Sequence, residues 1–214
     1  MINPKFIIGM TSVEVLVEII RVNLKRGFPG FKNEFIWFHK YVPRKNTQDM
    51  KNKSLLRPSF HDFSKSSRAG VKSELITVDY LNRWINLLEK NEALGIISEL
   101  KISYSFTEIY PYHIPMMDFR CPKSLENLLH IKELLRTIGQ EEGVILDSGR
   151  SYHYYGANLI DERHWWSFQE NCLSSELNLA DKRYIDHRFQ DRCSILRLSA
   201  SPLRPKIPTV VVIL

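Results

Sequence analysis

The stretch that decides the fold is Val144-Ile145-Leu146-Asp147-Ser148-Gly149-Arg150-Ser151-Tyr152-His153. A short apolar run, a glycine turn and a second run with alternating residues predict two antiparallel strands joined by a tight turn. Arg150 offers a planar fork of donors suited to phosphate, and Ser151 and His153 would point to one face of the second strand. The hairpin is therefore a candidate place to hold a triphosphate. A hairpin whose polar face is merely solvated would account for the same residues.

Acidic and basic residues flank this hairpin in a definite order. Upstream, an apolar strand-like run ends on Asp118, and downstream Asp186 precedes the strand-like stretch 193–201, which contains Arg197. Lys206 follows that stretch. The ordered set resembles the motifs of the archaeo-eukaryotic primase superfamily, the primase-polymerases. In that family an acidic pair lies on one strand, a Ser-x-His follows, and a third acid precedes an Arg-Leu-rich strand and a basic loop.

The resemblance covers roughly residues 110 to 210 and implies a role for each matching position. Its catalytic residues would be Asp118, His153 and Asp186, with Asp191 as the alternative third acid, and we expect the first three to converge in one cleft. Its nucleotide-binding residues would be Arg150, Ser151, His153, Arg197 and Lys206. It also implies that Asp118 and Asp186 hold Mg²⁺ or Mn²⁺, because such cations prefer carboxylate and water oxygens.

The sequence departs from the family pattern in the first motif. The family has Asp-x-Asp or Asp-x-Glu, whereas this chain has Asp118-Phe119-Arg120. Residues two apart share a strand face, so Arg120 takes the place of a metal-binding carboxylate and repels a cation there. The closer resemblance is to a single-aspartate subgroup. We expect Arg120 to pair with Asp118 or Asp186, and nucleotidyl transfer to be weak or lost while triphosphate binding persists.

The composition is that of a soluble globular protein, with 43% hydrophobic and 25% charged residues. No run approaches the roughly 18 apolar residues of a membrane span, and the start of the chain lacks the features of a secretory signal. The cysteines, Cys121, Cys172 and Cys193, are widely spaced, which predicts a reducing, cytoplasmic location without disulfides. Because there is no CxxC or compact Cys/His group, no zinc site is expected.

The formal net charge of +6 and the pI near 9.2 are compatible with nucleic acid or another acidic partner. Basic residues gather in a serine- and asparagine-rich stretch, interleaved with Phe60, His61 and Phe63. Such a stretch can grip a strand through phosphate contacts and base stacking, although a solvated surface loop has the same composition. The candidate nucleic-acid contacts are Lys51, Lys53, Arg57, Lys65, Arg68 and Lys72.

The remaining pattern predicts an α+β fold. Helices are expected to start at Thr11, Thr77, Ser124 and Asp161, and Asp181 is a candidate cap of another short helix or of a turn. Apolar runs between these positions predict strands. The order favours an RRM-like palm with an antiparallel sheet backed by helices, preceded by a small α/β module with the basic loop. We expect the module to span residues 1–108 and the palm residues 109–214, together forming one compact unit.

Three functions fit these residues. The leading one is a DNA primase or primase-polymerase-like protein that binds nucleoside triphosphate and a DNA or RNA strand, beside a helicase or nuclease subunit. The alternative is a non-catalytic nucleic-acid-binding or scaffold protein on a degenerate primase fold. The third is a metal-independent hydrolase or nuclease that uses His153 or His187 as its base.

Overall fold

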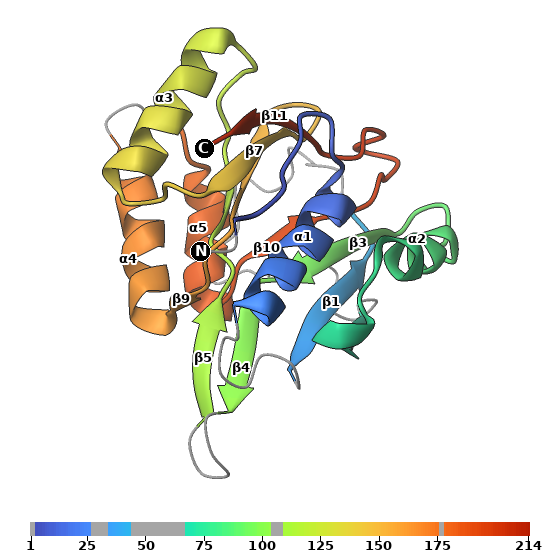
Figure 1. Cartoon of the computed structure of the whole chain (residues 1–214). Helices are drawn as coiled ribbons and strands as arrows, with labels where there is room; N and C mark the ends of the chain where they lie inside the picture. Colours follow the sequence, from blue (N-terminus) through green and yellow to red (C-terminus); the bar gives the residue numbers. More distant parts are fainter. Residues whose placement is uncertain (1–2, 27–33, 44–66, 104–108, 176–177) are drawn as a thin grey trace.

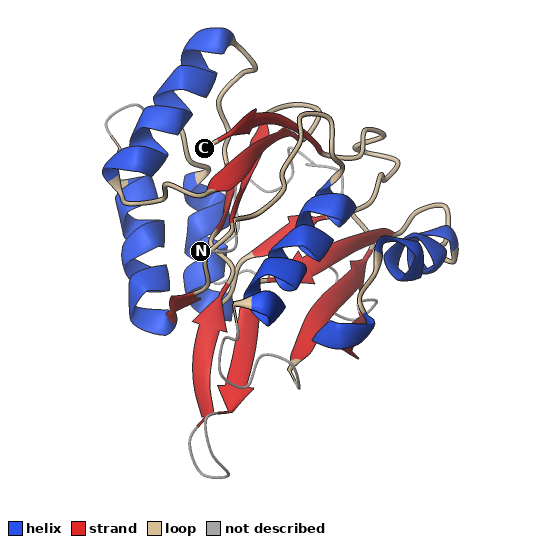
Figure 2. Ribbon diagram, in the orientation of Figure 1, coloured by secondary structure: helices blue, strands red, loops and turns tan. Residues whose placement is uncertain are grey.

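The computed structural model describes residues 3–26, 34–43, 67–103, 109–175 and 178–214. Within them the protein is a mixed α+β structure of antiparallel sheets and helices (Figures 1 and 2). Its α-helices are α1 (Ser12–Lys25), α2 (Val78–Asn86), α3 (Leu125–Thr137), α4 (Glu162–Leu173) and α5 (Lys182–Asp191). The fold class predicted from the sequence is confirmed, and the arrangement is compatible with a palm.

The strands of the described residues form three antiparallel sheets. The first has the order β10 (Ile195–Arg197), β3 (Ala93–Ile97), β1 (Phe35–Tyr41) and β2 (Ser67–Lys72). The second has the order β11 (Thr209–Ile213), β7 (Gly143–Asp147), β8 (Tyr152–Gly156) and β6 (Met116–Asp118). The small third sheet has the order β4 (Glu99–Ser103), β5 (Ile109–His113) and β9 (Ile160–Asp161).

The central hairpin forms as predicted, with β7 and β8 antiparallel and Leu146 opposite His153. Its turn contains Gly149, whose φ of +107° lies in a region that favours glycine. The Gly149 N–H donates to Asp147 Oδ1 over 2.8 Å, and the Ser148 N–H donates to the Ser151 carbonyl over 3.0 Å. These bonds hold the turn that carries Arg150.

Short-range signals set the helix starts. Thr11 and Glu14 form a capping box at the start of α1, because each side chain bonds the other's backbone N–H. The predicted N-caps of the other helices are confirmed by side-chain bonds to the first-turn N–H groups, at Thr77, Ser124, Asp161 and Asp181. Asp181 matters most for function, because it fixes where α5 begins.

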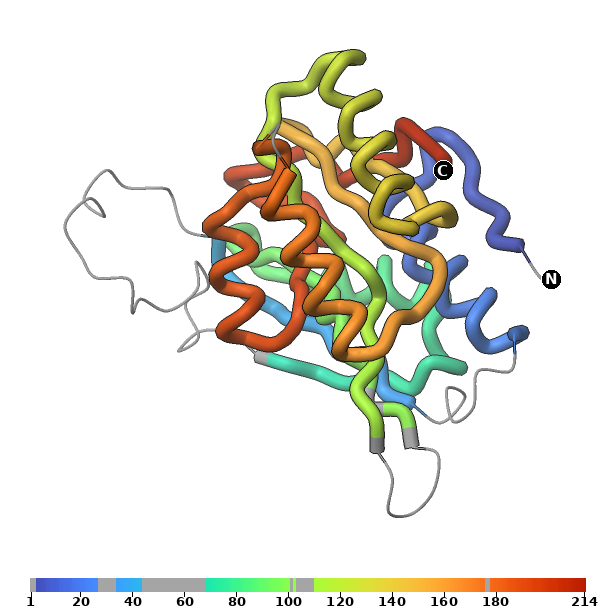
Figure 3. The backbone as a smooth tube through the Cα atoms, turned by 90° about the vertical axis from the view of Figure 1, so that its left-hand side faces the viewer, coloured from blue at the N-terminus to red at the C-terminus, as the bar shows by residue number. Residues whose placement is uncertain are grey.

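The two halves of the chain are interlocked. β10 comes from near the C-terminus but pairs with β3, while the segment before α1 pairs with β11 through the Val210 N–H and the Met10 carbonyl (2.8 Å). One apolar core joins α1 and β1 to residues of β7 and β8, and a second lies beneath α3, α4 and α5. These last three helices gather on one side of the molecule, as Figure 3 shows. The sheets thus cross the expected boundary at residue 108. The division into a module and a palm stays a prediction.

Three strands are not predicted by the sequence pattern. The sequence pattern places Arg68 and Lys72 in the basic loop, but they lie on β2, which pairs with β1 along Ile36↔Val71 and Phe38↔Ala69. The loop assignment of these two residues is therefore wrong. The other two are β5, which pairs with β4, and the short β9, which pairs with β5. None of the helices in the described part of the chain is both long enough and apolar enough to cross a membrane.

Candidate functional site

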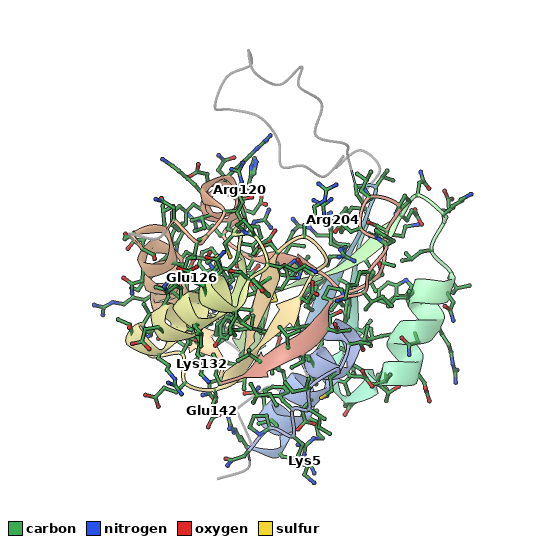
Figure 4. All side chains as sticks on the ribbon, turned by 90° about the horizontal axis from the view of Figure 1, so that it is seen from above. Lys5, Arg120, Glu126, Lys132, Glu142 and Arg204 are labelled. Atoms are coloured by element: carbon green, nitrogen blue, oxygen red, sulfur yellow. The ribbon has the colours of Figure 1, made fainter. Side chains whose placement is uncertain are left out.

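A cleft of about 840 Å³ lies where the end of β6, the hairpin turn, α5, β10 and the loop after β10 meet. Positive charge dominates its lining. Its arginines are Arg120, Arg150, Arg183, Arg188, Arg197 and Arg204, and its acids are Asp118 and Asp181. Figure 4 shows Arg120 and Arg204 at the same edge of the molecule, on the side away from Lys5. Six guanidinium groups against two carboxylates make this cleft a site for anions.

Asp118 and His153 meet in this cleft. Asp118 ends β6 directly opposite His153 on β8, and Asp118 Oδ1 lies 3.6 Å from His153 Nε2. Burial, and then the nearby Asp181 carboxylate, raise the pKa of Asp118 to about 7, although Arg204, Arg197 and Arg188 act in the opposite direction. Burial, followed by the charges of Arg197 and Arg204, lowers the pKa of His153 to about 3. At neutral pH the histidine is therefore uncharged and Asp118 is partly protonated.

The second acid of the cleft is Asp181, not Asp186. Asp181 caps α5 by accepting the backbone N–H groups of Arg183 and Tyr184, and its own N–H donates to the Asp118 carbonyl over 3.2 Å. Asp186 lies in the middle of α5 with an exposed side chain, and it does not line the cleft. The structure thus does not bring Asp186 to Asp118 and His153. The sequence marked Asp181 as a helix cap, which was the available signal for its position.

The alternative third acid, Asp191, lies at the other end of α5. Its Oδ2 lies 3.1 Å from Arg188 Nη2, which is within ion-pair distance, and its side chain does not line the cleft. Asp191 therefore positions an arginine instead of adding a carboxylate to the cleft.

Three predicted nucleotide contacts are occupied by bonds within the protein. Arg197 is buried, and its guanidinium donates to the carbonyls of Ser199, Lys206 (2.8 Å) and Ser148 (2.9 Å). It therefore ties the hairpin turn to the loop after β10. Ser151 Oγ donates to the Cys121 carbonyl over 2.8 Å, although its side chain also lines the cleft. Lys206 lies outside the cleft lining and pairs with Asp147 over 2.6 Å.

Other arginines are available to a ligand. Arg120 and Arg150 are exposed at the cleft. The expected ion pair of Arg120 with Asp118 or Asp186 is wrong, since neither pair forms among the described residues. The cations that act on Asp118 are instead Arg204, Arg197 and Arg188. Sequence reasoning missed Arg188 and Arg204 as members of the site.

Arg188 has an unusual environment. Its side chain is only 3% exposed, and its guanidinium lies 5.1 Å from the centre of the Tyr184 ring. Nη2 pairs with Asp191, but within the described ranges Nε and Nη1 have no hydrogen-bond partner. Buried N–H groups are almost always paired in folded proteins. The two orphaned nitrogens of a cleft-lining cation therefore point to an anionic ligand.

The predicted nucleic-acid contacts fall into two groups. Arg68 and Lys72 are exposed on β2. Lys51, Lys53, Arg57 and Lys65 lie outside the described residues.

The donor set does not fit a pair of divalent cations. Two-metal catalysis places carboxylates around two ions near the attacking and leaving oxygens, whereas the cleft offers Asp118 and Asp181 among six arginines. Asp118 is a poor ligand near neutral pH because its pKa is raised to about 7, and Asp181 Oδ1 is used in capping α5. In the part of the chain that the structure describes, no group of three or more His, Cys, Asp or Glu side chains could hold a metal.

Comparison with known proteins points to one family. The model of the AEP-like family, described as archaeo-eukaryotic primase 1D-like, matches residues 72–209, which is more than half of the chain. No curated protein and no solved structure matches. The matched range contains the hairpin, Asp118, α5 and the loop after β10, and so covers most of the cleft.

Proposed function

Since the chain belongs to the archaeo-eukaryotic primase family, we propose that its cleft binds a nucleoside triphosphate and a nucleic-acid strand, with nucleotidyl transfer weak or lost. The observation that carries this proposal is the excess of arginines over carboxylates in the cleft. Guanidinium groups pair with phosphate through two parallel N–H donors. A cleft with this charge favours a polyanion without needing a metal ion to neutralise it.

Three cleft arginines are well placed for the triphosphate. Arg150 sits on the hairpin turn and Arg204 on the loop after β10, while Arg188 supplies two orphaned donors from α5. Arg197 acts as a positioning residue, because its bonds hold the two loops that carry Arg150 and Arg204. The ligand would thus be held from three sides.

Weak transfer follows from the same geometry. Primases of this superfamily typically use divalent metals, and such ions neutralise charge and bring the reacting oxygens together. Arginines replace the charge of the ions but cannot coordinate an attacking hydroxyl. We therefore propose that phosphate binding persists in this chain while the chemical step is crippled.

Two measurements test the proposal. Binding of a nucleoside triphosphate by calorimetry should be detectable in EDTA, and it should weaken at least tenfold in the double variant Arg150→Ala/Arg204→Ala. Arg136→Ala, an exposed arginine on α3 outside the cleft, is the matched control and should bind like the wild type. Binding that requires Mg²⁺ or Mn²⁺ would contradict the proposal that the arginines hold the triphosphate without a metal ion.

The second measurement is incorporation of labelled nucleotides on a primed template with Mg²⁺ or Mn²⁺. We expect the wild type to show no more synthesis than Asp118→Ala. Robust synthesis by the wild type that Asp118→Ala abolishes would establish a working single-aspartate polymerase instead. A non-catalytic nucleic-acid-binding scaffold is the second candidate, and it would bind strands without binding free triphosphate.

A hydrolase that uses His153 as its base has less support. With a pKa of about 3, this imidazole is a weak base at neutral pH. A helicase or nuclease partner and a cytoplasmic location stay predictions.

A further inference from the structure

One face of β1 carries a ladder of four rings at alternate positions: Phe35, Trp37, His39 and Tyr41. Residues two apart on a strand share a face, and the rings are neighbours, with centroids 6.3 Å apart for Phe35–Trp37 and 5.5 Å apart for His39–Tyr41. Phe35 and Trp37 are 43% and 39% exposed, His39 is buried, and Tyr41 lines the cleft. The ladder therefore has two exposed rings at one end, and its other end reaches the functional site through Tyr41.

Core packing does not explain the exposed end of this ladder. The opposite face of β1 supplies the core, where Ile36 and Phe38 are fully buried. On the ladder face, Gly70 of β2 lies opposite Trp37. A Cβ at Gly70 would come within 3.2 Å of the rings of both Phe35 and Trp37. The absence of a side chain there lets both rings lie across the edge strand while still open to solvent.

Basic side chains flank the rings. Cross-strand partners in an antiparallel pair point to the same face, and Lys72 lies opposite Phe35 while Arg68 lies opposite His39. Both are exposed. The sequences of β1 and β2 contain no acidic residue. This face therefore combines flat apolar rings with positive charge only.

Arg188 stands where the ladder enters the cleft. Arg188 and Tyr41 both line the cleft. After burial, which is the main cause, the charge of Arg188 also contributes to lowering the pKa of His39. Its Nε and Nη1 are buried without a partner among the described residues. A buried donor without an acceptor is unfavourable, and the triphosphate of the proposed function would satisfy it, so this end of the ladder adjoins the nucleotide site.

We infer that a single-stranded nucleic acid lies on the exposed part of the outer face of β1 and is directed toward the cleft. Its bases stack on Phe35 and Trp37, and its phosphates contact Arg68 and Lys72. This inference rests on the proposed function and names the path and the strandedness of the partner.

Exposed aromatic rings in a basic groove are the general means by which proteins bind unpaired strands, because every base has a stacking face. The 6.3 Å between the first two rings is about twice the roughly 3.4 Å rise per nucleotide of a stacked strand, so two bases can engage separate rings. A duplex hides its bases from such rings.

Binding of fluorescein-labelled oligo-dT and oligo-U of ~12 nucleotides, measured by anisotropy, tests the path. Trp37→Ala should weaken binding about 5- to 150-fold, the range for loss of one stacked base, and Phe35→Ala should weaken it in the same direction. Tyr80→Ala, an exposed aromatic on α2, is the matched control and should leave binding unchanged. Arg68→Ala/Lys72→Ala should reduce the slope of log affinity against log salt by roughly 1.4, since each phosphate contact contributes about 0.7 on a single strand.

An abasic oligonucleotide separates stacking from charge. Wild type and Trp37→Ala should bind it equally, because it has no base to stack. Three results would each overturn the inference. The first is that Trp37→Ala loses as much affinity for the abasic strand as for the ordinary strand, and the second is that it keeps the affinity of the wild type for the ordinary strand. The third is that the wild type binds a duplex as tightly as a single strand.

Triphosphate binding, measured on the same variants, separates this inference from the proposed function. If triphosphate binds but no oligonucleotide does even at low salt, the path along β1 is wrong and the ladder is a protein-binding face. If neither ligand binds, the proposed function fails as well. Trp37→Ala should bind triphosphate like the wild type, which also shows that this variant is folded.

Discussion

Asp118→Asn should stabilise the protein, and the gain should grow as pH rises. Burial and the Asp181 carboxylate raise the pKa of Asp118 from 3.8 to about 7 in the folded protein, whereas an unfolded chain ionises this group near a pKa of about 3.9. The folded state therefore retains a proton that the unfolded state releases. Folding stability then falls as pH rises from about 4 to about 7 and changes no further above that range. Asparagine does not ionise, so the variant avoids this loss of folding stability at higher pH.

The magnitude follows from the pKa and the exposure of the group. A pKa raised by about 3 corresponds to roughly 4 kcal/mol at 1.36 kcal/mol per unit. The Asp118 side chain retains 37% of its surface exposed towards the cleft, so water screens the effect and we expect about 1–2 kcal/mol. In a protein of 214 residues, about 1 kcal/mol moves Tm by roughly 2–4 °C. The gain at pH 8 should thus be about 2–8 °C.

Thermal and urea unfolding between about pH 4 and pH 8 would measure this effect. The matched control is Asp186→Asn, which changes an exposed carboxylate on α5 and should leave stability unchanged. A gain of equal size at every pH would mean that Asp118 is not protonated in the folded protein. A loss that grows with pH would mean that Asp118 is an ionised partner of the surrounding arginines, and either result would refute the reasoning.

Three further outcomes follow from the same cleft. Triphosphate affinity should fall as pH rises through about 7, because ionised Asp118 repels phosphate, and calorimetry on Asp118→Asn should show that this dependence is lost. Arg120→Asp should increase Mn²⁺ affinity, measured by paramagnetic relaxation, because it adds a carboxylate beside Asp118 and removes a positive charge; an unchanged affinity would mean that the two side chains point apart. Arg197→Met should lower the free energy of unfolding by about 2–5 kcal/mol in urea, because buried carbonyls lose their donor; a smaller loss than in Arg136→Met would argue against its positioning role.

The parts of the fold that the sequence predicts are those with local causes. The hairpin follows from an apolar run, Gly149 and an alternating run, and each helix start follows from a side chain that bonds N–H groups three residues away. β2 has no such signal. Its sequence, Ser-Arg-Ala-Gly-Val-Lys, forms a strand because Val71 and Ala69 lie against Ile36 and Phe38 of β1. That pairing joins segments far apart in the chain, so local pattern could not reveal it.

The site, like the fold, is predictable where its causes are local. Asp118 and His153 could be brought together because both sit on strands of one sheet, and their register puts them opposite each other. Asp186 was expected near them because it precedes the last strands, but α5 intervenes and its helical period turns Ile185 and Arg188 inward and Asp186 outward. Arg197 has the charge of a phosphate ligand, yet its donors are consumed by carbonyls from two distant loops. Charge is read from a sequence, whereas the partner of that charge is set by the fold.

The charge of the cleft also explains why binding and chemistry can separate. In a two-metal site the carboxylates of the protein hold cations, and the cations both bind phosphate and align the attacking and leaving oxygens. Here the cations belong to the protein: Arg150 and Arg204 face the cleft on loops, and Arg188 faces it from a helix with two donors unpaired among the described residues. Guanidinium groups hold phosphate by directed hydrogen bonds, but they offer no coordination position for a hydroxyl. Their charge also keeps divalent ions away from the Asp118–Asp181 pair. We therefore propose that fixed arginines in place of exchangeable metal ions would preserve recognition of a triphosphate and leave the site without the groups that align the reacting oxygens.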